Sequence, residues 1–198
     1  MAWVKAEYAP ELAVLSTWIS MLLPWSVAYH AKGPLGSVLV FVRFSVFELQ
    51  LRFPSQITFE GVPLDVAQAL NQVYSGVQIG GNVYVALPPT AALDYGGSLA
   101  LANGIWTVAA LLLLIAFVLS LAVYTDESRA ERLPYPYPRL AGALLGGSTV
   151  VLALAAVLMA IERGTVGFPI PVGVLVMGAL SFVLLRVDIV ADGGPASE

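Results

Sequence analysis

Long apolar runs without a charged residue dominate the hydropathy pattern of this chain. No Asp, Glu, Lys or Arg lies between Gly96 and Thr125, or between Leu140 and Ile161. An α-helix needs about 20 apolar residues to cross the hydrocarbon core of a bilayer, and both runs reach that length. The pattern therefore predicts membrane-spanning helices over residues 98–124 and 140–161.

Two shorter apolar runs extend this interpretation. Residues 12–29 follow Pro10 and Glu11, which are typical of a first helical turn, and residues 171–187 form the last run. A secretory signal peptide is the competing interpretation of the first run, but its start mixes Lys5 with acidic residues and no small-x-small cleavage site follows it. We therefore predict an integral membrane protein, mainly α, built as a four-transmembrane-helix bundle.

Residues 30–97 show the alternation of β-strands instead. Residues 37–53 are rich in β-branched and aromatic side chains, and a change in the polar phase near Val46 predicts a bulge or tight turn there. Residues 57–60 indicate another short strand, residues 64–74 a short amphipathic helix, and Gly80-Gly81-Asn82 the loop of a hairpin. We expect a small α+β insert that forms an extracytoplasmic cap between the first two membrane helices.

The distribution of Lys and Arg sets the expected orientation. With four crossings, the chain ends and the loop at residues 125–139 share one side, and the short loop at residues 162–170 on the other side carries only Arg163. The positive-inside rule then predicts a cell-membrane protein with both termini in the cytoplasm. The residues on the basic side are Lys5, Arg129, Arg132, Arg139 and Arg186. The expected segments are 1–29 (N-terminus and first helix), 30–97 (cap), 98–124 (second helix), 125–139 (cytoplasmic loop), 140–161 (third helix), 162–170 (outer loop), 171–190 (fourth helix) and 191–198 (tail).

Aromatic residues near the ends of the predicted helices are candidate anchors at the membrane interfaces, where amphipathic rings prefer to lie. Trp106 lies about two turns too deep for such a position and is expected to pack between helices instead. The candidate anchors are Trp3, Trp25, Tyr29, Tyr95 and Tyr124.

Small and polar residues within the runs are candidate helix-packing sites. Gly142 and Gly146, with Gly147, form a small-residue face that permits close helix approach, and packing within one chain is favoured over homodimerisation. Asn103 and Ser148 are expected to form hydrogen bonds between helices, which is favoured over their lining a permeation path.

Composition limits the chemistry. Hydrophobic residues make up 59% of the chain and charged residues 11%, against about 25% charged in soluble domains. The chain has no cysteine and one histidine, His30, so no transition-metal site is expected. We find no catalytic or cofactor motif and expect no enzyme activity and no cofactor. A net charge of −4 without a basic run argues against nucleic-acid partners.

Two resemblances follow from these features. Leu23-Pro24-Trp25 at the end of the first predicted helix, with the strand-rich first loop, resembles the claudin-like tetraspan plan. That resemblance implies a fold only, because the family's Trp-Gly-Leu-Trp signature and its cysteine pair are missing here. The chain is also similar to small uncharacterised multi-pass membrane proteins of haloarchaea, and seven Arg against two Lys with an acidic excess fit such a source.

The leading functional hypothesis is a non-enzymatic accessory, assembly or interaction subunit. It contacts membrane lipid and, through its cap and helices, another membrane or envelope protein, and homo-oligomerisation stays open. The alternative is a small oligomeric channel or transporter component, although its polar lining would be sparse. A sensor or lipid-binding role is a third hypothesis, which no residue specifically supports.

Overall fold

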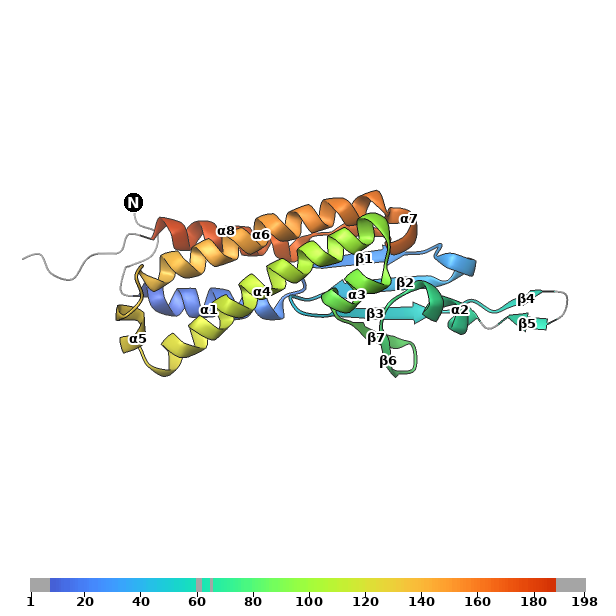
Figure 1. Ribbon diagram of the computed structural model, residues 1–198, viewed down its shortest axis with the longest axis horizontal. Helices are drawn as coiled ribbons and strands as arrows, with labels where there is room; N and C mark the ends of the chain where they lie inside the picture. Colours follow the sequence, from blue (N-terminus) through green and yellow to red (C-terminus); the bar gives the residue numbers. More distant parts are fainter. Residues whose placement is uncertain (1–7, 60–61, 65, 188–198) are drawn as a thin grey trace, which may run out of the picture.

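The computed structural model describes residues 8–59, 62–64 and 66–187, and its main sheet lies toward one end of the long axis, where the long helices that start from the other end reach over part of it (Figure 1). Helices α1 (Ala9–Leu22), α4 (Gly97–Thr125), α6 (Tyr137–Ile161) and α8 (Val172–Arg186) lie side by side at one end. The sheet occupies the other end, and its strands run along nearly the same direction as the helices.

The main sheet has six antiparallel strands in the order β6-β7-β3-β2-β1-β8. Its strands are β1 (Ser26–His30), β2 (Val38–Arg43), β3 (Glu48–Phe53), β6 (Val77–Gly80), β7 (Val83–Ala86) and β8 (Phe168–Ile170). Two further strands, β4 (Ile57–Phe59) and β5 (Val62–Leu64), form a separate antiparallel pair.

Short helices connect these parts. They are the 3₁₀ helix η2 (Pro34–Gly36), α2 (Val66–Val73), α3 (Pro88–Asp94), α5 (Ser128–Glu131) and α7 (Arg163–Val166). The chain after α2 and the first half of α4 cover one face of the sheet, where Tyr74 contacts Phe41 and the Trp106 indole N–H donates to the Ser45 carbonyl (3.0 Å). Aromatic side chains thus join the helices to the covered face of the sheet.

The predicted four-transmembrane-helix bundle is wrong, and so is the multi-pass assignment that rested on four crossings. Among the described residues, only α4 and α6 are long and apolar enough to cross a membrane. Helices α1 and α8 have 14 and 15 residues, or roughly 21–22 Å at 1.5 Å per residue, which falls short of a hydrocarbon core of about 30 Å. The fold is α+β, with a six-stranded antiparallel sheet as its second main component.

The first predicted span fails for a local reason. Pro24 has no backbone N–H and disfavours helical geometry at the preceding residue, so α1 ends at Leu22 and Leu23 is already extended. The chain then continues as β1, and the predicted outer loop at residues 162–170 supplies β8, which pairs with β1. The sheet therefore includes a strand that precedes the predicted insert in the chain, β1, and a strand that follows it, β8.

Within the insert, several sequence-based predictions are confirmed. Strands β2 and β3 are joined by a tight turn in which the Phe44 N–H donates to the Phe47 carbonyl (2.8 Å), close to the predicted phase change. Helix α2 lies within residues 64–74, and β6 and β7 form the predicted hairpin. Gly81 in its loop has a φ of +50°, a conformation that glycine adopts without strain.

A close backbone contact joins the helices to the sheet. Gly173, near the start of α8, packs against the Pro24 carbonyl, and a Cβ at this position would lie 2.6 Å from the Trp25 Cα. Both neighbours are backbone atoms that cannot rotate away. At Gly104, inside α4, a Cβ would meet no such neighbour within 4 Å.

We expect Gly173→Ala to lower the free energy of unfolding by about 1–3 kcal/mol, because the added methyl overlaps backbone at the junction of α8 with β1. Gly104→Ala is the matched control and should raise stability by about 0.5–1 kcal/mol through helix propensity. Chemical or thermal unfolding of the purified variants measures both effects. Equal stability of the two variants would contradict the close packing of α8 on Pro24 and Trp25, just before β1.

Candidate functional site

Charged and polar side chains of the sheet point inward, toward the helices. Along β2 and β3 the burial alternates, so that Arg43, Glu48, Gln50 and Arg52 are buried while the residues between them keep part of their surface exposed. Arg43 and Glu48 are directly opposite in the β2–β3 register. We call these four residues the buried polar row.

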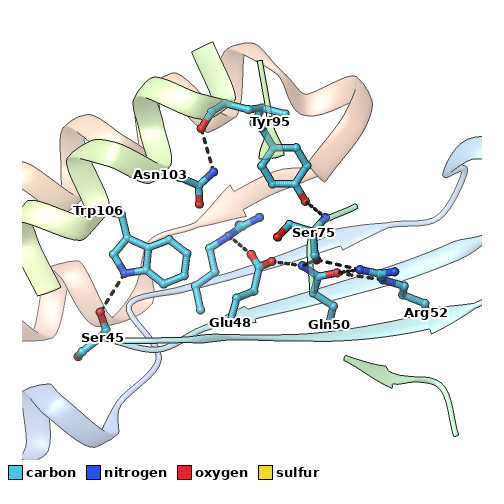
Figure 2. Close-up of polar contacts among 10 residues, drawn as sticks. Ser45, Glu48, Gln50, Arg52, Ser75, Tyr95, Asn103 and Trp106 are labelled. Carbon is cyan, nitrogen blue, oxygen red and sulfur yellow. Dashed lines mark hydrogen bonds and ion pairs between the residues drawn. The ribbon is translucent and has the colours of Figure 1, made fainter. Parts of the chain in front are cut away.

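The members of the buried polar row are linked one to the next (Figure 2). Arg43 Nε lies 2.5 Å from Glu48 Oε2, and this ion pair is almost fully removed from solvent. The Gln50 amide donates to Glu48 Oε1 (2.6 Å), and Arg52 donates to Gln50 Oε1 from Nε (3.0 Å) and Nη2 (2.6 Å). A single chain of charge-assisted contacts therefore crosses the covered face of the sheet.

Arg52 is held by neutral acceptors in the part of the chain that the structure describes. Its guanidinium donates to Asn71 Oδ1 (2.8 Å) and to the Ser75 carbonyl (2.9 Å), and it lies 3.9 Å from the centre of the Tyr84 ring. Burial lowers the pKa of Arg52, and the nearby Tyr95 partly opposes that shift. The Arg52 guanidinium is therefore stabilised by neutral hydrogen-bond acceptors and by the face of an aromatic ring.

The segment after α2 covers the buried polar row on the side away from the sheet. The Ser75 hydroxyl donates to Asp94 Oδ2 (2.6 Å), and the Ser75 N–H donates to the Tyr95 hydroxyl (3.2 Å). The Tyr74 hydroxyl donates to the Thr165 carbonyl (2.6 Å), which links this segment to α7. Burial raises the pKa of the Tyr95 hydroxyl, and it raises the pKa of Tyr74 to about 12.

A cavity of about 60 Å³ adjoins Arg52. Small-molecule sites in proteins usually enclose about 300 Å³ or more, whereas this space holds only a few water molecules. Its lining residues are Arg52, Pro54, Leu70, Gln78, Gly81, Asn82 and Tyr84. Among the described residues, no three His, Cys, Asp or Glu side chains come together to hold a metal ion. The geometry of the buried polar row is that of a structural anchor.

The opposite face of the sheet is apolar across all six strands. The register places Val27 beside Val42, Tyr29 beside Val40, and Val40 beside Leu51, so these residues share one face. Every one of these side chains is partly or largely exposed. We call this surface the open face; its residues are Val27, Tyr29, Val38, Val40, Val42, Leu49, Leu51, Phe53, Val77, Val83, Val85, Phe168 and Ile170.

Neither face was identified from the sequence. The alternation of residues 48–53 was visible there, and it separates Glu48, Gln50 and Arg52 from Leu49, Leu51 and Phe53. Alternation alone does not tell which set is covered, and the usual expectation buries the apolar set. In this sheet the polar set is covered.

The predicted interface anchors lie in different environments. Trp25 is fully buried and packs edge-on against Trp106 (5.4 Å between ring centres), so its assignment as an anchor is wrong. Tyr95 is also engaged inside the protein, through its hydroxyl. Tyr29 is exposed on the open face, and Tyr124 is exposed near the end of α4 beside Trp18. Trp3 lies outside the described residues.

The predicted packing residues of α6 face α8 and α4. A Cβ at Gly142 would lie 3.0 Å from the Leu184 Cβ, and one at Gly146 would lie 2.7 Å from the Ser181 hydroxyl. Gly147 faces Leu112 of α4. The small-residue face therefore serves contacts within one chain.

The two polar candidates in the long helices bond within their own helix. The Asn103 side-chain amide donates to the Leu99 carbonyl and the Ser148 hydroxyl to the Leu144 carbonyl, both at 2.8 Å and one turn earlier. The predicted hydrogen bonds between helices are therefore not the ones these groups make.

The comparison with protein families gives one finding. A model of a family of unknown function, DUF7549, matches residues 2–189. The chain belongs to this family. Since the function of DUF7549 is unknown, the match assigns no role to any residue of the buried polar row or the open face. No curated protein matches the chain.

The buried ion pair makes a prediction about stability. Glu48→Gln leaves the Arg43 charge buried without its counter-ion and should cost about 3–5 kcal/mol of the free energy of unfolding. Replacing both residues by methionine removes both charges and should cost less than the single change. Arg129→Ala breaks an exposed pair with Asp126 and serves as control, with an expected change below about 0.5 kcal/mol. A double variant that loses as much stability as Glu48→Gln, or more, would contradict the coupling.

Tyr74 predicts a loss of stability at alkaline pH. In the unfolded chain tyrosine ionises near pH 10, whereas folded Tyr74 ionises near pH 12, so the contribution is complete below pH 10 and is lost as the pH rises to 12. The loss amounts to about 2–3 kcal/mol for two pKa units. Tyr74→Phe should be less stable at pH 8, through loss of the hydrogen bond to Thr165, but should show a smaller further loss between pH 10 and 12. Parallel denaturation curves at several pH values test this; identical slopes for both proteins would refute it.

Proposed function

We propose that the chain is a non-enzymatic, membrane-anchored protein that contacts another protein through its sheet. The observation that carries the anchor is the exposed apolar surface of α4 and α6. Only 33% of the most apolar stretch of each helix is buried inside the protein. A helix that is apolar all round belongs either in a protein core or in lipid, and these two are not enclosed by protein.

The exposed side chains on these helices are large. Val118 of α4 is 61% exposed and Val150 of α6 is 71% exposed, and Leu111 and Leu154 are more than half exposed. Each such side chain costs about 1–2 kcal/mol when left in water rather than buried. Lipid around the α4–α6 hairpin removes that cost. Helices α1 and α8 pack against the hairpin and carry exposed Leu15 and Phe182.

The direction of insertion follows from charge. The connection between α4 and α6 carries exposed Arg129 and Arg132, whereas the sheet lies at the far end of the helices (Figure 1). The start of α1 and the end of α8 lie at the same end as this connection. The positive-inside rule therefore supports a cytoplasmic connection, with the sheet on the opposite side of the membrane.

The sheet supports an interaction role rather than catalysis. The buried polar row and its neighbours are engaged in mutual contacts, and the adjoining cavity has room for only a few waters. The open face, in contrast, is a continuous apolar surface of the kind that marks contact sites. An accessory or assembly role on the outer side of the membrane fits both features. A haloarchaeal source is part of the proposal and rests on composition, with Arg in excess of Lys and acidic residues in excess of both.

The membrane anchor is testable because the chain contains no cysteine. Val118→Cys and the control Leu93→Cys, an exposed position on α3 outside the open face, are labelled with an environment-sensitive fluorophore in liposomes containing brominated lipid. We expect quenching by the brominated tails at position 118 and quenching by aqueous iodide at position 93. Iodide quenching at both positions would refute the anchor.

A further inference from the structure

The open face carries no charged side chain. Its thirteen residues are aliphatic or aromatic, and on β2, β3, β7 and β8 the residues between them are buried on the covered face. Tyr29 and Phe168 lie side by side on β1 and β8 at one side of the surface, and Phe53 lies on β3. Val40 lies near the centre, between Tyr29 and Leu51.

The size of the open face is that of a specific interface. Six strands spaced about 4.8 Å apart, with about five residues each at about 3.3 Å, span roughly 450 Å² in projection, before side-chain relief is counted. Two such faces in contact therefore remove on the order of 1,000 Å² or more from solvent, which is where specific protein interfaces begin. The projected area of one open face also matches the largest apolar patch of an ordinary monomer, about 300–600 Å², which often serves as a contact site.

The direction of the strands decides what can reach this surface. The strands run along nearly the same direction as α4 and α6 (Figure 1), so in an anchored molecule the open face stands upright on the membrane. A surface that stands upright cannot lie flat on lipid. A second copy anchored in the same bilayer and related by a two-fold axis along the membrane normal presents the same face to it, with strands aligned.

The lack of charge favours a second copy over an unrelated protein. In a two-fold interface each residue faces the same surface of the other subunit, so a charged patch would meet its own charge. An uncharged face is self-complementary without any such repulsion. Two apolar sheet faces also pack readily at about 10 Å, as in a β-sandwich.

We infer that two copies of this chain pair through their open faces and form a β-sandwich outside the membrane, with Val40 near the two-fold axis. The inference rests on the proposed membrane anchor, which sets the upright orientation of the sheet. In this arrangement the aromatic residues Tyr29, Phe53 and Phe168 are buried only in the dimer and supply much of its binding energy.

The test uses the full chain in phosphatidylcholine–phosphatidylglycerol liposomes. Val40→Cys is treated with a short bifunctional maleimide, and Leu93→Cys, exposed on α3 outside both the membrane helices and the open face, is the control. We expect a crosslinked product of twice the 20.9 kDa chain mass for Val40→Cys and none for Leu93→Cys at high dilution in lipid. Single-molecule photobleaching of the labelled wild-type chain should show two steps.

Val40→Asp places a carboxylate against its own copy and should weaken pairing by at least about tenfold, giving mainly one bleaching step. The circular dichroism spectrum shows whether the variant folds, and the Val40→Cys crosslink decides the matter if it does not. One bleaching step and no crosslink, together with lipid quenching at position 118, would overturn the pairing while leaving the anchor intact. Crosslinking in native membranes only to a protein of another mass would overturn it as well. If brominated lipid does not quench the fluorophore at position 118, the membrane anchor itself is refuted, which is a result distinct from a failure of pairing.

Discussion

The ion pair between Arg43 and Glu48 joins the two central strands of the sheet, β2 and β3, on their covered face, and the other contacts of the buried polar row are built onto it. The Glu48 carboxylate, removed from water, is paired with Arg43 and accepts from Gln50, and Arg52 continues the chain of contacts along β3. The carbonyls of Tyr74 and Ser75 then satisfy Arg52. Helix α2, its following segment and α3 are held over the sheet by these polar contacts as much as by apolar packing.

On β3 the polar set is buried, so the apolar set faces outward, because neighbouring side chains of a strand point to opposite faces. On β2 both sets are apolar apart from Arg43, so Leu39 and Phe41 are buried while Val38, Val40 and Val42 extend the open face. The same constraint fixes the register of β2 and β3: a slip by one residue would bring Arg52 and Glu48 to the solvent side and break every contact of the row. The buried charges thus fix the strand register, and that register places the apolar residues of β3 on the open face.

Local patterns predicted local structure well, and the arrangement of those parts poorly. The alternation at residues 48–53, the amphipathic helix before Gly76 and the glycine-rich loop at residues 80–82 each depend on neighbours in the sequence, and each was found. The uncharged run ending at Tyr29 indicated only that these residues are removed from water, and not which secondary structure they form. Pro24 and the pairing of β1 with β2 and β8 decide its structure, and that pairing joins residues about 140 positions apart. The buried polar row was missed because charged side chains in a strand are ordinarily expected to face solvent.

The two apolar surfaces of this molecule differ in what can cover them. The backbone of α4 and α6 is bonded within each helix, so lipid can surround these helices at no cost in hydrogen bonds. The sheet has two edges, β6 and β8, whose outward N–H and C=O groups need water or protein. Hydrocarbon would leave those groups unsatisfied at several kcal/mol each, which bars the sheet from the membrane interior. The buried contact of Trp25 with Trp106 lies at the junction of the two regions, so the surface that lipid can cover ends there.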